Sequence, residues 1–256
     1  MSRPEVLFPL FADLDTLEGV GPQTAQTLNG LGITAPRDLL FTLPHTGIDR
    51  ALKDTIQGAV LPATLTVKVK VGAHAPSRSR GGAYRIHATD SETSFQLVFF
   101  HGRSDYLNKV LPEGTERVVS GRVELFDGIA NMVHPDHILP VNEAADIPAY
   151  EPVYPLTGGV TQKTMFKATR GALTRIPVMD EWIDPNQITQ AKWPGFADAM
   201  AKAHNPLNQN DLAATSLART RLAYDELLAH QITLALARAS ERKTPGQVTQ
   251  GPGALQ

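Results

Sequence analysis

The sequence predicts an α+β protein in three parts: a small N-terminal helical region, a central five-stranded β-barrel, and a C-terminal helical region with a long helix. Two observations predict it. Strand-like alternation of apolar and polar residues is confined to the middle of the chain, and the clearest helical periodicity lies near its end. We place the three parts at residues 1–60, 61–145 and 146–256.

The composition is that of a folded protein without disulfides. The chain has 256 residues, of which 42% are hydrophobic and 20% charged, so it can bury a core. Because cysteine is absent, thiolate zinc sites, iron–sulfur clusters and cysteine nucleophiles are excluded. We expect a cytosolic protein, since no apolar run approaches the roughly 20 residues that span a bilayer and no signal peptide is recognisable. The net charge of −2 argues against coating of nucleic acid by bulk charge, so any such contact has to be local.

Residues 1–60 have the pattern of short helices separated by glycine and proline. The most specific local motif is LEGVGPQTAQTLNGLGI, at residues 17–33. Gly19 and Gly21 allow a tight hairpin, and Pro22 suits the first turn of the following helix. The pattern matches a helix-hairpin-helix module, whose hairpin amides usually face DNA phosphates without reading bases. The alternative is a hairpin that only packs two helices together.

Five strand-like segments in the middle of the chain predict a small barrel. They are residues 64–71, 84–90, 94–100, 117–126 and 129–134. Turn-forming pairs such as Asp90-Ser91 and Asp127-Gly128 separate some of them. The longer gap after the third segment has apolar residues at helical spacing, and a helix after strand three of five is the arrangement of the OB-fold barrel.

Aromatic residues in the third strand are candidates for contact with nucleic-acid bases. Because successive side chains of a strand point to opposite faces, we expect either Phe99 or Phe100 to be exposed, unless both rings are buried in the small barrel. An exposed ring on an OB surface can stack on unpaired bases. Nearby basic residues are candidates for phosphate contacts, although a solvated surface of mixed charge explains most of them equally well: Arg78, Arg80, Arg85, Arg103 and Lys109.

The C-terminal part is predicted to be helical after an acidic, proline-containing strap. Residues 161–176 carry four basic side chains and no acidic one, and three of them, Lys163, Lys167 and Arg170, share one helical face. This face is a second candidate for contact with the DNA backbone, or it is simply solvated. Residues 216–242 have the clearest helical pattern, with an apolar face that we expect to be buried. The residues of this face are Leu217, Tyr224, Leu228, Ile232, Ala235 and Ala239. The Gly/Pro-rich end predicts a loop, as in a fragment cut between domains.

Motifs for catalysis, nucleotide binding or metal binding are missing from the sequence. His134, Asp136 and His137 lie close together, but residues three apart on an extended strand face opposite ways, so we expect no metal there. The sequence has neither G-x-x-x-x-G-K-[ST] nor a serine-nucleophile motif. We therefore assign no catalytic residue.

Several segments, taken in order, carry a resemblance to a known family. They are the hairpin motif, DLLFTLP, LVFFHGRSDYL, SGRVELFDG, MVHPDHI, VYPLTGGVTQKT and RLAYDELLAHQ. Together they resemble the N-terminal part of the RecG family of ATP-dependent DNA helicases. The resemblance implies that the barrel is a wedge domain at the branch point of a DNA fork, with Phe100 and Tyr106 capping the separated bases. The spacer between these rings, residues 101–105, is longer than in many members of the family.

The resemblance also implies partners and cofactors. A RecA-like motor that uses ATP and Mg²⁺ would begin just beyond Gln256, so we expect residues 1–256 to hold no cofactor and to hydrolyse no ATP alone. The implied partners are branched DNA, including forks and Holliday junctions, and the protein's own helicase domains. The implied protein is a monomer of the bacterial cytoplasm and nucleoid that acts in DNA repair and recombination. One alternative function is an OB-fold protein-interaction module without DNA binding. Another is an enzyme, which no motif in the sequence supports.

Overall fold

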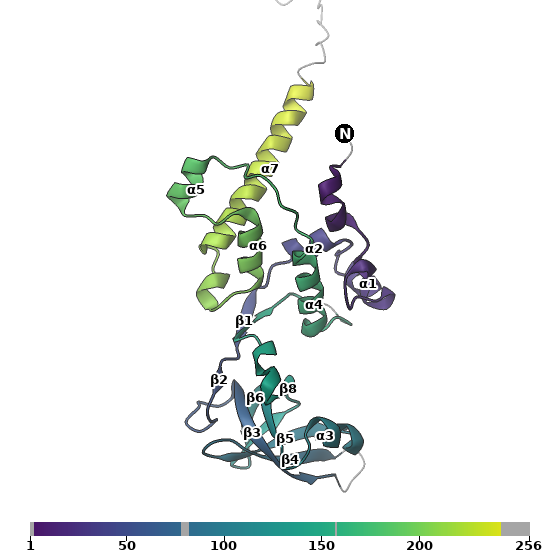
Figure 1. The fold of residues 1–256 in the computed structure, drawn as a ribbon, viewed down its shortest axis with the longest axis vertical. Coiled ribbons are helices and arrows are strands. Elements are labelled where there is room, and N and C mark those ends of the chain that lie inside the picture. The colour runs from purple at the N-terminus through teal and green to yellow at the C-terminus, as the bar shows by residue number, and fades with distance from the viewer. Residues whose placement is uncertain (1–2, 78–81, 157, 242–256) are drawn as a thin grey trace, which may run out of the picture.

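The computed structural model describes residues 3–77, 82–156 and 158–241. A helical region lies above a β-barrel in Figure 1, and a narrow waist joins them. The waist is a two-stranded antiparallel sheet of β1 (Thr46–Asp49) and β9 (Tyr150–Val153). The Gly/Pro-rich end that predicts a loop lies outside the described residues.

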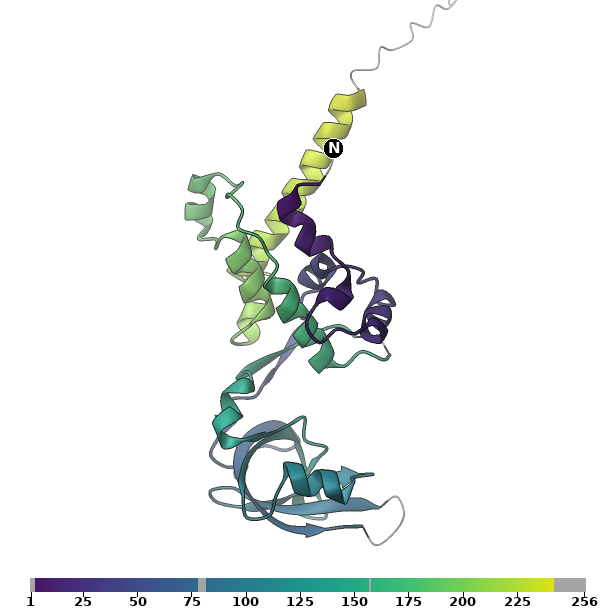
Figure 2. The same ribbon diagram turned by 45° about the vertical axis from the view of Figure 1, so that its right-hand side comes forward.

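The barrel has the order expected from the sequence. Its five strands are β3 (Ala63–Ala75), β4 (Ala83–Thr89), β5 (Ser94–Phe100), β6 (Glu116–Phe126) and β7 (Ile129–Val133). They pair in the order β3-β4-β5-β7-β6, and β6 pairs again with β3, so the sheet closes into the ring seen in Figure 2. The helix α3 (Ser104–Val110) follows the third strand of the ring. The prediction of an OB-like barrel is therefore confirmed.

Alternation along the strands fills the interior of this barrel. Val67, Val69 and Val71 of β3 point inward with Phe95 and Leu97 of β5, and all of them are buried. Two short strands extend the sheet beyond the ring: β2 (Leu52–Lys53) beside β3, and β8 (His137–Pro140) beside β6. The closed ring leaves a packed and rigid body on which exposed side chains can be held.

A buried arginine connects the waist to the barrel. Arg50 follows β1 and donates to Ser120 Oγ at 2.9 Å and to Asp136 Oδ2 at 3.0 Å, and it also pairs with Glu151 of β9. His137 Nε2 lies 3.4 Å from the same glutamate. This network ties both strands of the waist to β6 and to the loop before β8.

The helical region is built from both ends of the chain around one core. Its elements are η1 (Glu5–Phe11), η2 (Leu14–Thr16), α1 (Pro22–Asn29), α2 (Pro36–Phe41), α4 (Gln162–Leu173), α5 (Pro185–Ala191), α6 (Phe196–His204) and η4 (Gln209–Leu212), together with α7 (Leu217–Glu241); η3 (Val141–Asp146) lies nearer the barrel. Leu28 and Leu39 from the N-terminal part pack in one cluster with Met165 and Met200. Thr161 caps α4 by accepting a hydrogen bond from the Thr164 N–H at 3.2 Å.

A buried histidine joins α6 to this core. The His204 Nε2 lies 2.8 Å from the Leu40 carbonyl oxygen, and its Nδ1 lies 3.1 Å from the Tyr154 hydroxyl. Because a carbonyl only accepts, Nε2 carries the proton and Nδ1 accepts from tyrosine. Burial lowers the pKa of His204 from 6.5 to about 4 and raises that of Tyr154, so both groups are neutral in the folded protein.

This histidine makes the fold sensitive to mild acid. Unfolded His204 takes up a proton below pH 6.5, whereas the folded side chain takes one up only near pH 4. Stability is therefore lost as the pH falls through this window, by about 2 kcal/mol between pH 7 and pH 5. Urea unfolding at both pH values measures this loss. The His204→Gln variant should lose much less stability between the two pH values, and an unchanged loss would assign it to other groups.

The last helix, α7, matches the helix expected at residues 216–242, but its buried face is different from the expected one. Leu217 and Ile232 of the predicted apolar face are exposed, while Ala218 and Arg221 are buried. The reason is that only the first turns of α7 pack on α6, and its second half extends away from the helical region (Figure 1). Among the described helices, none combines the length and apolarity needed to cross a membrane.

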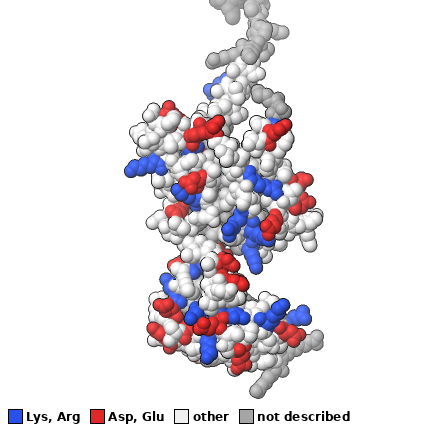
Figure 3. Space-filling model, viewed as in Figure 1, with Lys and Arg blue, Asp and Glu red and all other residues white. Residues whose placement is uncertain are grey.

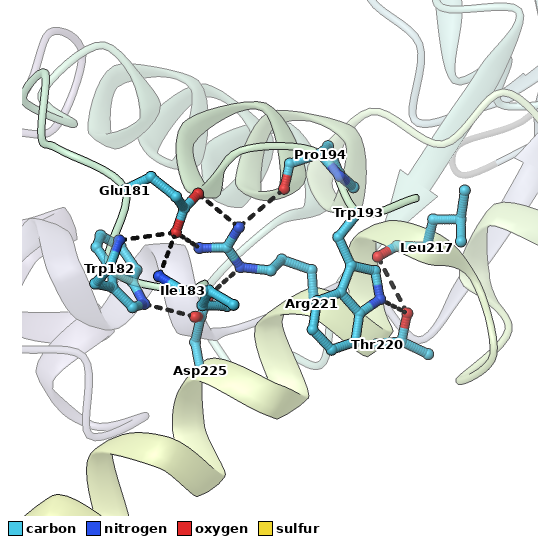
Figure 4. Close-up of polar contacts among 9 residues, drawn as sticks. All are labelled: Glu181, Trp182, Ile183, Trp193, Pro194, Leu217, Thr220, Arg221 and Asp225. Carbon is cyan, nitrogen blue, oxygen red and sulfur yellow. Dashed lines mark hydrogen bonds and ion pairs between the residues drawn. The ribbon is translucent and has the colours of Figure 1, made fainter. Parts of the chain in front are cut away.

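Arg221 is the centre of a buried ion network (Figure 4). Its side chain has an exposed fraction of 0%, and it binds Glu181 at 2.8 Å and Asp225 at 2.9 Å. It also donates to the Pro194 carbonyl at 3.1 Å, and Trp182 Nε1 donates to Asp225 at 2.7 Å. The network holds the segment before α5 and the loop before α6 against α7.

Candidate nucleic-acid interface

Two aromatic rings project from neighbouring elements of the barrel. Phe100, the last residue of β5, is 47% exposed, and Tyr106, in the first turn of α3, is 61% exposed. Phe95 and Phe99 are buried in the barrel. Alternation therefore places Phe99 inside and Phe100 outside, and the alternative in which both rings are buried is wrong.

The turn between β5 and α3 fixes the direction of Tyr106. His101 has a positive φ of 58°, which reverses the chain directly after Phe100. At Gly102 an added Cβ would lie 2.7 Å from Leu107 Cδ1 and 3.1 Å from Phe99 Cβ, so the missing side chain lets α3 pack against the barrel. Because Leu107 is buried there, the neighbouring Tyr106 points to solvent.

His134 supports the Phe100 ring, a role that sequence reasoning missed. The Phe100 N–H donates to His134 Nε2 at 3.3 Å, and the two ring centroids are 5.7 Å apart. The backbone of His134 is held by its N–H bond to the Val98 carbonyl, at 2.9 Å. No pattern in the sequence places His134 beside Phe100, because the contact joins residues 34 positions apart.

The side chains of His134, Asp136 and His137 do not come together as metal ligands. His134 contacts Phe100, whereas Asp136 and His137 face Arg50 and Glu151 in the waist. Within residues 3–77, 82–156 and 158–241, no group of three or more His, Asp or Glu side chains could hold a metal ion.

Basic side chains flank the exposed rings. Arg103 precedes α3 and Lys109 lies near its end, and both are exposed. Arg85 is exposed on β4, opposite Val98 of β5. None of these three has an ion-pair partner in the described part of the chain, so they are available to phosphates. Arg78 and Arg80 lie outside the described residues.

The structure brings the other two sets of candidates together on the helical region. The hairpin residue Gly19 lies beneath the side chain of Lys167 in α4: a Cβ added to Gly19 would be 2.5 Å from Lys167 Nζ. Lys163 and Arg170 are exposed on the same helix, and Figure 3 shows Lys and Arg side chains gathered over α4. Gly21 is exposed at the start of α1. This surface is separate from the rings, which lie on the barrel (Figure 1).

Known proteins share this architecture. Residues 13–176 match the family model described as RecG wedge domain. The ATP-dependent DNA helicase RecG of Aquifex aeolicus is 29% identical over 231 residues, which cover 85% of this chain and 29% of that protein. The ATP-dependent DNA helicase RecG of Bacillus subtilis is 30% identical over 239 residues, which cover 89% of this chain and 32% of that protein.

A solved structure of RecG bound to a three-way DNA junction has the same fold. It superposes on 97% of this chain, and on 36% of its own chain, with a TM-score of 0.70 at 25% identity. The chain thus spans about a third of the length of these similar proteins.

Proposed function

Because this chain belongs to the RecG wedge domain family, we propose that it is the part of an ATP-dependent DNA helicase that engages branched DNA. In this proposal it binds the branch point of forks and Holliday junctions during recombination and repair. The observation that carries the proposal is the outward direction of Phe100 and Tyr106 on a packed barrel. Its other partner is the protein's own helicase motor.

The chemistry of the proposal is base stacking without base reading. Separating a base pair exposes two faces that were stacked, and an aromatic side chain replaces part of that interaction. The Phe100 ring is held by His134 on one side and by a strand of the closed barrel, so little conformational entropy is lost when a base stacks on it. Arg103 and Lys109 are positioned to bind phosphates beside the rings.

We place ATP and Mg²⁺ outside residues 1–256. The sequence lacks the phosphate-binding motif G-x-x-x-x-G-K-[ST]. In this proposal the chain contributes position and base stacking, while strand movement is driven elsewhere in the longer protein.

A second candidate function, binding to protein, is favoured by the tip of the β6–β7 hairpin. Phe126, Leu125 and Ile129 are exposed there around the Asp127-Gly128 turn, where Asp127 has a positive φ of 51°. An apolar tip beside an acidic residue suits a protein surface better than a phosphate backbone. This tip and the rings are different surfaces, so the two functions can be tested separately.

Fork binding at increasing salt tests the proposed function. The chain should bind a fluorescent three-way fork more tightly than a linear duplex of equal length. The logarithm of both affinities should fall linearly with the logarithm of the salt concentration, because phosphate contacts release counterions. Equal affinity for fork and duplex at every salt concentration would reject the junction-binding function. Absence of DNA binding would favour the protein-interaction function.

A further inference from the structure

We propose that the hairpin at residues 17–21 and the exposed face of α4 form one groove that binds the phosphate backbone of a duplex arm. It is a second DNA site on the helical region, separate from the rings of the barrel. The inference rests on the proposed function, since a junction has duplex arms on both sides of its branch point.

The groove has preformed walls. It has a volume of about 580 Å³ and lies between the end of η2, the hairpin and the outer face of α4. A Cβ added to Gly171 would be 3.4 Å from Leu17 Cδ2, so the helix and the hairpin are in close contact. Two residues after the end of α4, Arg175 donates to the Thr16 carbonyl at 2.5 Å and to its hydroxyl at 2.8 Å. These contacts fix the two walls relative to each other.

Two backbone N–H groups of the hairpin lie beside the groove, next to Lys167 in its lining. The N–H groups of Gly19 and Gly21 have no hydrogen-bond partner within the described part of the chain. Gly19 has a φ of 76°, and the Lys167 ammonium group lies over it. Backbone N–H groups in a tight turn, together with an ammonium group, are suited to the oxygens of a phosphate.

Basic side chains lie on both sides of Lys167 along α4: Arg170 in the lining of the groove, and Lys163 one turn nearer the start of the helix. Lys163, Lys167 and Arg170 form a row about 10 Å long, because they are spaced over seven residues of a helix that rises about 1.5 Å per residue. Neither Lys163 nor Arg170 has an ion-pair partner among the described residues, and the Arg170 guanidinium lies 5.7 Å from the centre of the Phe166 ring. A row of this length can follow one strand of a duplex, which carries one charge per about 3.4 Å of helix axis.

Glu18 is the acidic residue in the lining of the groove. Its Oε1 lies 3.5 Å from Lys167 Nζ, and its side chain is otherwise exposed. A phosphate bound at Lys167 would meet this carboxylate, so Glu18 weakens the site. Removing the charge of Glu18 and removing that of Lys167 must therefore change DNA affinity in opposite directions.

The test compares charge-neutralising variants of the whole chain on a linear duplex and on a fork. The variant Lys163→Gln/Lys167→Gln/Arg170→Gln should lower the salt slope of binding by about 1 for each lost phosphate contact. It should weaken duplex and fork by the same factor, because no base is read. The matched control neutralises three exposed basic residues elsewhere, Lys192→Gln/Lys202→Gln/Arg238→Gln, and should keep the parent slope.

The Glu18→Gln variant should bind both DNAs more tightly than the parent, whereas Lys167→Gln alone should bind both more weakly. Loss of folding would weaken both variants, so the opposite signs identify the groove. An unchanged slope in the triple variant, or weaker binding by Glu18→Gln, would overturn the inference.

The fork preference of the parent chain is independent of this result. If the parent shows no preference for forks but the salt slope still falls in the triple variant, the junction-binding function is rejected and the groove is supported. A parent chain that binds no duplex overturns the groove.

Discussion

The Phe100→Ala variant should bind a fork about 5-fold to 150-fold more weakly than the parent chain, with little change for a linear duplex. The range follows from about 1–3 kcal/mol for each base stacked on an aromatic ring. A linear duplex has no unpaired base to stack on the ring, so only the fork should be affected. Tyr106→Ala should act in the same direction, and the double variant should lose most of the preference for forks.

The barrel itself offers a matched control for this experiment. Phe126 is also an exposed phenylalanine at a strand end, at 67%, but it lies at the β6–β7 hairpin and not beside α3. Phe126→Ala should leave fork and duplex affinities near those of the parent. Phe100→Trp keeps a stacking surface and should retain most of the fork preference. Equal losses on fork and duplex, or an equal loss in Phe126→Ala, would contradict base stacking by Phe100.

Strand alternation made the barrel predictable, and the same rule limited what could be said of its surface. Apolar residues at every second position of β3 and β4 marked strands whose inner face is buried. The rule states that Phe99 and Phe100 face opposite ways, but not which of them faces the core. That choice depends on how the ring of strands closes, through the parallel pairing of β5 with β7 and the antiparallel pairing of β6 with β3.

Contacts between distant segments were beyond sequence reasoning. The waist strands β1 and β9 are four residues each, contain Gly47 and Pro152, and pair across about a hundred residues, so no local pattern marks them. Gly19 and Lys167 were separate candidates because only the shared core of the helical region brings α4 against the hairpin. Periodicity alone could not identify Arg221 as buried, because an arginine in a helix normally counts as solvent-facing.

The Arg221→Ala variant should lose about 3–5 kcal/mol of unfolding free energy, the usual cost of removing one partner from a buried ion pair. The change leaves the Asp225 carboxylate, whose side chain is 11% exposed, with Trp182 Nε1 as its remaining side-chain donor. Glu181 keeps its bonds from the N–H groups of Trp182 and Ile183. The hydrogen bond from Arg221 is the main cause that lowers the pKa of Glu181, so that pKa should rise in the variant. Urea unfolding measures the loss of stability.

Two further variants separate the free-energy cost of a buried carboxylate without its partner from the cost of lost packing. Arg221→Met keeps most of the side-chain volume but still leaves both carboxylates, so it should remain strongly destabilised. Adding Asp225→Asn removes the more deeply buried charge and should recover part of the loss, since an ion network replaced as a unit is often tolerated. Arg238→Ala, at an exposed site near the end of α7, should change stability by less than about 0.5 kcal/mol. If Arg221→Ala changed stability as little as Arg238→Ala, the network would not hold α7 against the segments before α5 and α6.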